Sequence, residues 1–211
     1  MSLAAVVMVG MLLGGSVAAQ QGEQAALDQM RHFPAYQRAL LRVYQRYESG
    51  FPAHCQSAAV EPGTGRAKVV HPLQLDARGR IVSGAWTEQM QGIACGERRH
   101  YNALVIFKEG TPSLYPMLPG DSYASPLLQH DAIFQVAAAL GVVGGTCLPE
   151  VIDTALPEGA PASVGVAWNE KWTVRNCTGL YLVPVHFVPD ATGTGIHVKL
   201  NEIVQVSGKS K

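Results

Sequence analysis

Two stretches of this chain repeat a tryptophan, a glutamate and a cysteine at the same spacing. They are AWTEQMQGIAC at residues 85–95 and AWNEKWTVRNC at residues 167–177, 82 positions later. Alternate residues of a strand point to the same face, so Glu88 shares a face with Trp86, and Glu170 shares one with Trp168. A carboxylate among large apolar side chains must be paired, or its pKa rises. Both glutamates are therefore candidates for chemistry or for a structural ion pair.

Three interpretations of this pattern are open. In the first, each tryptophan anchors a core and each glutamate pairs with an arginine or with backbone N–H groups. In the second, Glu88 and Glu170 converge as the acid/base pair of a glycan hydrolase. In the third, Trp86, Glu88, Trp168 and Glu170 line a cleft for a small ligand. We favour the first, because two similar environments are poor at separating two pKa values, and we predict no catalytic residues.

Four cysteines predict two disulfides. An even number behind an export signal is typical of a disulfide framework, and four cysteines allow three pairings. The repeat favours pairing within each half, as Cys55–Cys95 and Cys147–Cys177. A zinc site is disfavoured, because the chain has no C-x-x-C and no histidine at ligand spacing from a cysteine. We expect no metal and no cofactor.

The N-terminus predicts export. Residues 3–19 are apolar or small and carry no charge, and the segment ends in SVAAQQ, which suits signal-peptidase cleavage before Gln20. An uncleaved anchor is the alternative. The rest of the chain has no second apolar run of membrane length. Sixteen basic residues balance sixteen acidic ones, so neither a nucleic-acid partner nor a membrane surface is expected.

A short helix is expected in EQAALDQMRH (23–32), and helical spacing appears twice in the rest of the mature chain. Apolar residues at helical intervals follow Pro34 and end at Gly50. A second helix follows Ser125 and Pro126, which fit the N-cap and first helical positions, and it should end at Gly141. About four strand-like segments follow each helix. The sequence therefore predicts an α+β protein.

The two halves look related. Apolar side chains alternate in YNALVIF (101–107) and again in LYLVPVHF (180–187), at an offset of 80 rather than 82. The second half should therefore lack two residues after its cysteine. We predict a signal peptide at 1–19, one α+β half at 20–120 and another at 121–211. Each half would contain a helix, about four antiparallel strands and one disulfide.

Several motifs occur in the same order as in other exported proteins. The stretches YNALVIF, MLPGDSYASPLLQHDA, WNEKWTVRNC and VPVHFVPDATGT resemble a group of uncharacterised exported proteins from Xanthomonas- and Stenotrophomonas-type bacteria. This resemblance covers residues 52–198 and implies export without an assigned activity. The order of ALVIFKEGTPSLYPML, LLQHDAIFQVAAAL and PVHFVPD is faintly similar to the carboxy-terminal domain of TonB-type proteins. That similarity implies a periplasmic protein-interaction module.

These observations together predict a periplasmic or secreted protein without enzymatic activity. Its partner should be another protein of the cell envelope. A glycan hydrolase and a small-ligand binder with a tryptophan-lined cleft are the alternatives. The sequence leaves the oligomeric state open, and also whether the two sheets join.

Overall fold

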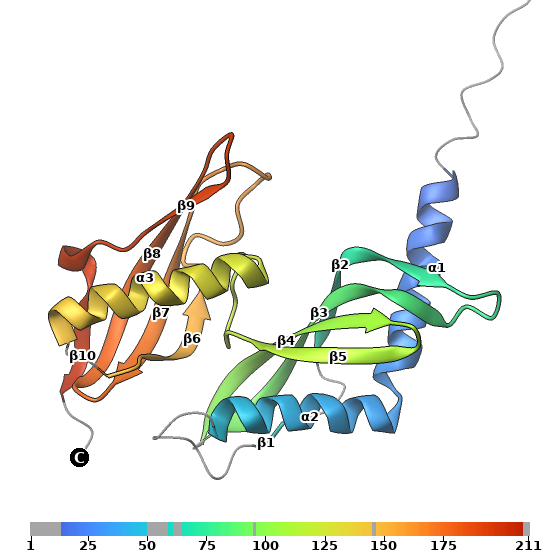
Figure 1. Ribbon diagram of the computed structural model, residues 1–211, viewed down its shortest axis with the longest axis horizontal. Coiled ribbons are helices and arrows are strands. Elements are labelled where there is room, and N and C mark those ends of the chain that lie inside the picture. Colours follow the sequence, from blue (N-terminus) through green and yellow to red (C-terminus); the bar gives the residue numbers. More distant parts are fainter. Residues whose placement is uncertain (1–13, 50–58, 61–64, 95, 145–146, 209–211) are drawn as a thin grey trace, which may run out of the picture.

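The residues that the structure describes fold into an α+β arrangement of three α-helices and two antiparallel sheets (Figure 1). A computed structural model describes residues 14–49, 59–60, 65–94, 96–144 and 147–208. The predicted Cys55–Cys95 disulfide and most of the predicted signal segment lie outside the described residues.

The first sheet has five strands, and two helices pack on one of its faces. The helices are α1 (Gly14–Arg31) and α2 (Pro34–Ser49). The strands are β1 (Ala59–Val60), β2 (Arg66–Leu75), β3 (Ile81–Ala94), β4 (Glu97–Lys108) and β5 (Thr111–Met117). The order is β1-β3-β4-β5, and β2 also pairs with β3. All pairings are antiparallel.

The second sheet has five strands and one helix. The helix is α3 (Pro126–Gly144), which crosses one face of the sheet (Figure 1). The strands are β6 (Glu150–Ala155), β7 (Trp168–Asn176), β8 (Gly179–Pro189), β9 (Thr194–His197) and β10 (Val204–Gly208), with the 3-10 helix η1 (Leu200–Glu202) before β10. The order is β10-β8-β7-β6, and β9 also pairs with β8.

Local sequence signals set where the helices begin. α2 begins at Pro34 and α3 at Pro126, as predicted, and the Ser125 hydroxyl accepts the Leu128 N–H at 3.3 Å as an N-cap does. The first half, however, carries two helices rather than one. α1 runs through the predicted cleavage position after Ala19, and its C-terminal part packs into the first core.

The two central hairpins share one register. Trp86 pairs with Val105 and Trp168 pairs with Phe187, so both strands are offset by 82 positions. The last pair of the first hairpin is Ala94 with Glu97, and that of the second is Asn176 with Gly179, again 82 positions later. The predicted offset of 80 in the second strand is therefore wrong, because no residues are missing after the second cysteine. Descent of the halves from one duplicated unit stays a prediction.

Each sheet buries one face in a core of its own. The first core packs α1 and α2 on alternate residues of β3 and β4, among them Trp86, Met90 and Tyr101. The second packs α3 on alternate residues of β7 and β8, among them Trp172, Val183 and Phe187. Burying these side chains supplies the main free energy of folding.

The predicted disulfide of the second half is confirmed. Cys147 and Cys177 are bonded, with their Cα atoms 5.8 Å apart. Cys147 lies just after α3, and Cys177 lies in the loop between β7 and β8. The bond therefore ties Cys147, which follows α3, to the β7–β8 hairpin on which α3 packs.

The segment 118–121 joins the two sheets. The Gly120 N–H donates to the His100 carbonyl of β4 at 2.7 Å, and the Asp121 N–H donates to the Thr154 carbonyl of β6 at 2.6 Å. The Thr154 hydroxyl donates to the Pro119 carbonyl at 2.8 Å. One short segment therefore hydrogen-bonds to the edges of both sheets.

Glycine is required at the centre of this joint. Gly120 has a φ of +91°, a conformation that side chains disfavour. A Cβ there would lie 2.2 Å from the Thr154 carbonyl oxygen and 2.3 Å from the Thr154 nitrogen. Both obstructing atoms are backbone, so the sheets themselves would have to move apart.

We predict that Gly120→Ala strongly destabilises the protein. The strained backbone and the overpacking should each lower the free energy of unfolding by about 1–3 kcal/mol. Thermal and denaturant unfolding of the two proteins would measure this. Gly159→Ala is a matched control, because Gly159 also has positive φ but a Cβ added there would meet no other atom within 4 Å. Equal melting of both variants would contradict the role of the joint.

Candidate functional site

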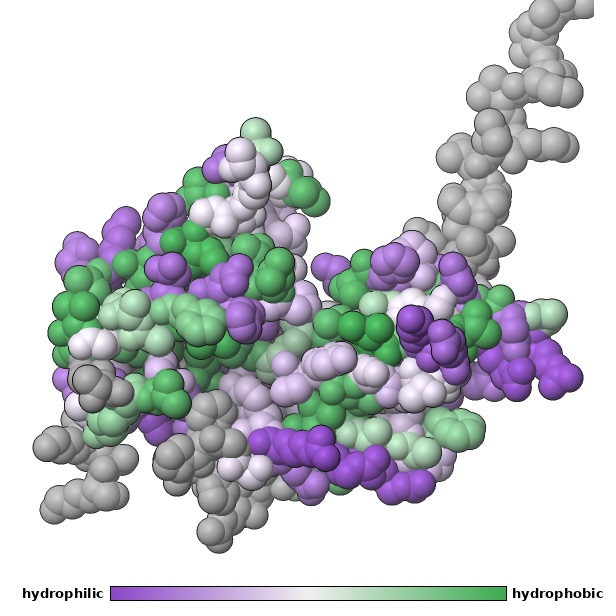
Figure 2. All heavy atoms as spheres, viewed as in Figure 1, coloured by the Kyte–Doolittle hydropathy of each residue, from purple (hydrophilic) through white to green (hydrophobic). Residues whose placement is uncertain are grey.

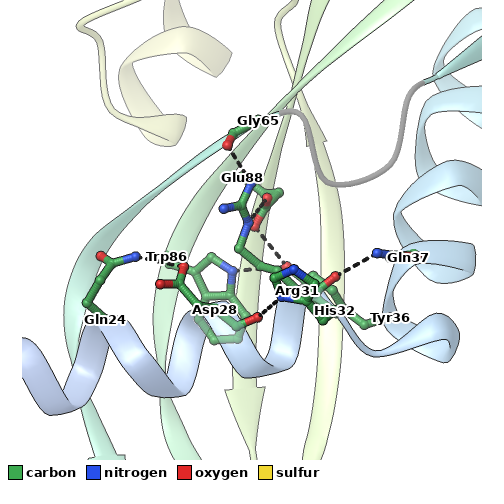
Figure 3. A network of polar contacts seen from close by, with 9 residues as sticks. All are labelled: Gln24, Asp28, Arg31, His32, Tyr36, Gln37, Gly65, Trp86 and Glu88. Carbon is green, nitrogen blue, oxygen red and sulfur yellow. Dashed lines mark hydrogen bonds and ion pairs between the residues drawn. The ribbon is translucent and has the colours of Figure 1, made fainter.

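Glu88 forms an ion pair deep in the first core. Its Oε1 accepts the Arg31 Nε–H at 2.7 Å, and its Oε2 accepts the Tyr36 hydroxyl at 3.3 Å. The Trp86 Nε1–H donates to the same hydroxyl at 3.0 Å. Arg31 also donates to the Gly65 carbonyl at 2.5 Å (Figure 3). The network connects α1, α2 and β3 through one carboxylate that is only 1% exposed.

Two opposing effects act on the Glu88 carboxyl. Burial raises its pKa above the ordinary 4.5, while the Arg31 charge and the hydrogen bonds from Arg31 and Tyr36 lower it, and burial is the stronger effect. Burial also raises the pKa of the Tyr36 phenol, so this hydroxyl stays a neutral donor. In this cluster Glu88 is therefore bonded to one arginine and one tyrosine, and the tyrosine is bonded to Trp86 in turn.

Glu170 is satisfied in a different way. Its Oε1 accepts the Ser122 hydroxyl and the Tyr123 and Ala124 N–H groups at 2.9–3.1 Å. The Trp168 indole N–H also donates to Oε1, at 3.1 Å, and the Trp172 indole N–H donates to Oε2 at 2.9 Å. Five neutral donors thus replace the arginine of the first half. They attach the loop before α3 to β7.

The structure does not bring the two glutamates together. Each lies 1% exposed in its own core, and the residues of the two cores do not overlap. Trp86 and Trp168 are buried beside them, against Phe107 and Phe187. A substrate or ligand could reach these four residues only if the cores opened. Within the described residues, no three His, Cys, Asp or Glu side chains form a metal site.

Sequence reasoning missed the partners of Glu88. Arg31 is 57 positions from Glu88, in a helix that the sequence predicts to be short. One signal could have found it, because Arg31 is four residues after Leu27 and so lies on the buried face of the same helix. Ser122, which donates to Glu170, lies in the segment between β5 and α3, where no spacing pattern points to a partner for Glu170.

The outer face of α3 is an apolar surface that the second core leaves open. Its inner residues Ala132, Val136 and Leu140 are at most 1% exposed. On the opposite side, Leu127 is 70% exposed and Val142 is 72% exposed. Figure 2 shows hydrophobic residues along this helix, interrupted by hydrophilic ones.

The exposed residues of α3 form one stripe. Leu127, Phe134, Ala138 and Val142 are spaced by seven, four and four residues, which places them along one side of the helix. Phe134 is 60% exposed, and the His130 ring contacts its edge with the ring centres 4.9 Å apart. The stripe is interrupted by His130 and Asp131, and an exposed row of apolar side chains of this kind is a candidate interaction site.

The length and composition of α3 also meet the criterion for a membrane span. Among the described residues, the stretch 126–143 is the one helix long and apolar enough. The expectation of no second apolar run of membrane length is therefore wrong, although core helices of soluble proteins reach the same length and apolarity. In this chain one side of the helix packs on the second sheet, which leaves a single face for contact with anything else.

Comparisons with protein-family models, with curated proteins and with solved structures found no match to this chain. The resemblance to exported Xanthomonas-type proteins and to TonB-type domains therefore stays a prediction.

We predict that Glu170→Gln lowers the stability more than Glu88→Gln does. A glutamine at position 170 must turn an N–H group toward one of the five donors, which leaves a buried donor unpaired at about 1–3 kcal/mol. At position 88 the glutamine oxygen can face Arg31 while its amide donates to the Tyr36 oxygen. Denaturant unfolding of both variants would measure the difference, and a larger loss for Glu88→Gln would contradict it.

We also predict a pH dependence for Glu88. Folding raises the pKa of this carboxyl. Its contribution to the free energy of unfolding is therefore fully present below pH 4.5, and it is lost as the pH rises through the pKa of the folded state. The stability difference between the wild type and Glu88→Gln should therefore be largest at low pH and shrink toward neutrality. A difference that grows with pH would show that the Arg31 charge outweighs burial.

Proposed function

We propose that this chain is an exported, non-enzymatic protein-interaction module of the cell envelope, and that the outer face of α3 is its binding surface. The single observation that carries the proposal is the stripe of Leu127, Phe134, Ala138 and Val142, which faces solvent while the opposite side of the helix is buried. Export is supported by the apolar N-terminal segment and by the Cys147–Cys177 bond, since disulfides persist in oxidising compartments.

The helix is held at both ends, which favours binding. Glu170 attaches the loop before α3 to the sheet, and the disulfide fixes the segment after it. A surface that is already rigid loses little conformational entropy on association. The same tethers also present all the exposed residues of the stripe in one fixed geometry.

The charge of α3 favours a protein over a lipid surface. Helices that lie on membranes usually carry several Lys or Arg residues, which attract anionic lipids. α3 has neither residue, and its one charged side chain, Asp131, would be repelled by phosphate groups. Asp131 lies beside the apolar stripe and is about half exposed. The complementary partner is therefore a protein that presents apolar side chains around one basic residue.

Site-specific photo-crosslinking tests this function. A photoreactive residue at Leu127, in the exported chain in its own cells, should form a covalent adduct with one envelope protein. With that partner purified, Phe134→Asp should weaken binding at least about tenfold, as the loss of a central aromatic contact does. Val164→Asp should leave binding unchanged, because Val164 is 92% exposed but lies on a loop outside α3.

Each alternative outcome has a distinct readout. Cofloatation of the wild type, but not of Phe134→Asp, with vesicles of anionic phospholipid would replace the protein partner with a membrane. Adducts formed only between copies of this chain would make the surface a self-association interface. Equal binding by Phe134→Asp and the wild type, with both fully folded, would remove α3 as the site.

A further inference from the structure

The first half of the chain contains a groove, and α3 belongs to the second half. It lies between the corner that joins α1 to α2 and the turns that join β2 to β3 and β4 to β5. Its volume is about 530 Å³, within the range of sites that bind small molecules. Its apolar lining residues include Met30, Phe33, Ala39, Ile81, Phe107 and Pro112.

The groove has a buried apolar base and an exposed aromatic mouth. Tyr36, Ile81 and Phe107 are each at most 5% exposed overall, so the groove ends on residues of the first core. Phe33 is 61% exposed at the helix corner, where an aromatic ring gains little from folding alone. Trp86 lies behind Phe107, with the ring centres 6.3 Å apart, and does not line the groove.

The two charged side chains of the groove differ in how many of their hydrogen-bonding groups are already used. Asp76 accepts the backbone N–H groups of Arg78 and Arg80 on Oδ1, and the Arg80 Nε and Nη2 groups on Oδ2. These bonds lower the pKa of Asp76, so its carboxylate stays charged and already has its donors. The Arg80 guanidinium has five N–H groups, and Asp76 takes two of them. The charged donors of the lining are therefore the remaining Arg80 N–H groups, and the Gln29 amide of the same lining can both donate and accept.

We propose that this groove binds a small apolar molecule that carries one carboxylate. The apolar body would contact Met30, Phe33 and Phe107, and the carboxylate would accept hydrogen bonds from Arg80. The Arg80 side chain is 62% exposed, so it can turn toward a ligand at the mouth without leaving a buried environment. Arginine suits this role because its planar fork matches a carboxylate.

Octanoate and octan-1-ol form a matched pair of probes. They share an apolar chain, and octanoate alone carries the carboxylate. Calorimetry on the full exported chain should show that octanoate binds and that octan-1-ol binds more weakly. Arg80→Gln should weaken octanoate binding by about two- to fivefold, the effect of an exposed ion pair, and leave octan-1-ol unchanged. Arg78→Gln is the control, since Arg78 belongs to the same turn but does not line the groove.

Two further variants separate this site from other surfaces. Ala39→Phe fills the groove from α2 and should abolish binding of both probes while the melting temperature is maintained. Asp76→Asn keeps the acceptor that the turn needs but releases Arg80, so octanoate should bind more tightly. Absence of octanoate binding, equal binding of the two probes, or binding that persists in Ala39→Phe would each overturn the proposal. None of these results bears on the α3 surface, which Phe134→Asp tests separately.

Discussion

The close approach of two backbones at Gly120 determines how the halves of this protein are held together. Each sheet has its own helices and its own core, so neither needs the other to bury its apolar face. Their relative position depends on the segment 118–121, which hydrogen-bonds to β4 on one side and to β6 on the other. The Tyr47 hydroxyl adds a bond from α2 to the Val151 carbonyl at 2.6 Å. Main-chain bonds form the centre of this joint, and the Thr154 and Tyr47 hydroxyls add side-chain bonds around it.

Within each half, a buried carboxylate organises the elements around it, and the two halves do so by different means. Glu88 has a full counter-charge, which Arg31 brings from α1. The second half has one helix instead of two, and Glu170 is surrounded by indole, hydroxyl and backbone donors. Both arrangements supply the hydrogen bonds that a buried carboxyl group needs, and Glu88 has a cationic partner in addition. The repeated Trp-x-Glu pattern therefore specifies a buried acid, and the surrounding chain determines which donors it bonds to.

Features that depend on neighbouring residues could be predicted from the sequence, and features that depend on distant ones could not. The α+β class, the helix starts at Pro34 and Pro126, and the Cys147–Cys177 pairing follow from local patterns and spacing. The apolar environment of Glu88 and Glu170 follows from strand alternation. The pairing of Glu88 with Arg31, the joint at Gly120 and the groove are formed by segments that meet only in three dimensions. The predicted register of the second hairpin is wrong because similar apolar alternation fits two offsets equally well, whereas backbone pairing admits one.

If the chain is exported, as we propose, the position of the joint also determines the order in which it acquires its structure. A chain that is translocated from its N-terminus presents α1, α2 and the first sheet before residue 121, and every donor and acceptor of the Glu88 network lies within that part. Thr154 and the rest of β6 emerge later. We therefore expect vectorial folding, in which the first half is complete while the segment 118–121 still exposes one unpaired edge, and the second half then assembles against that edge as a template.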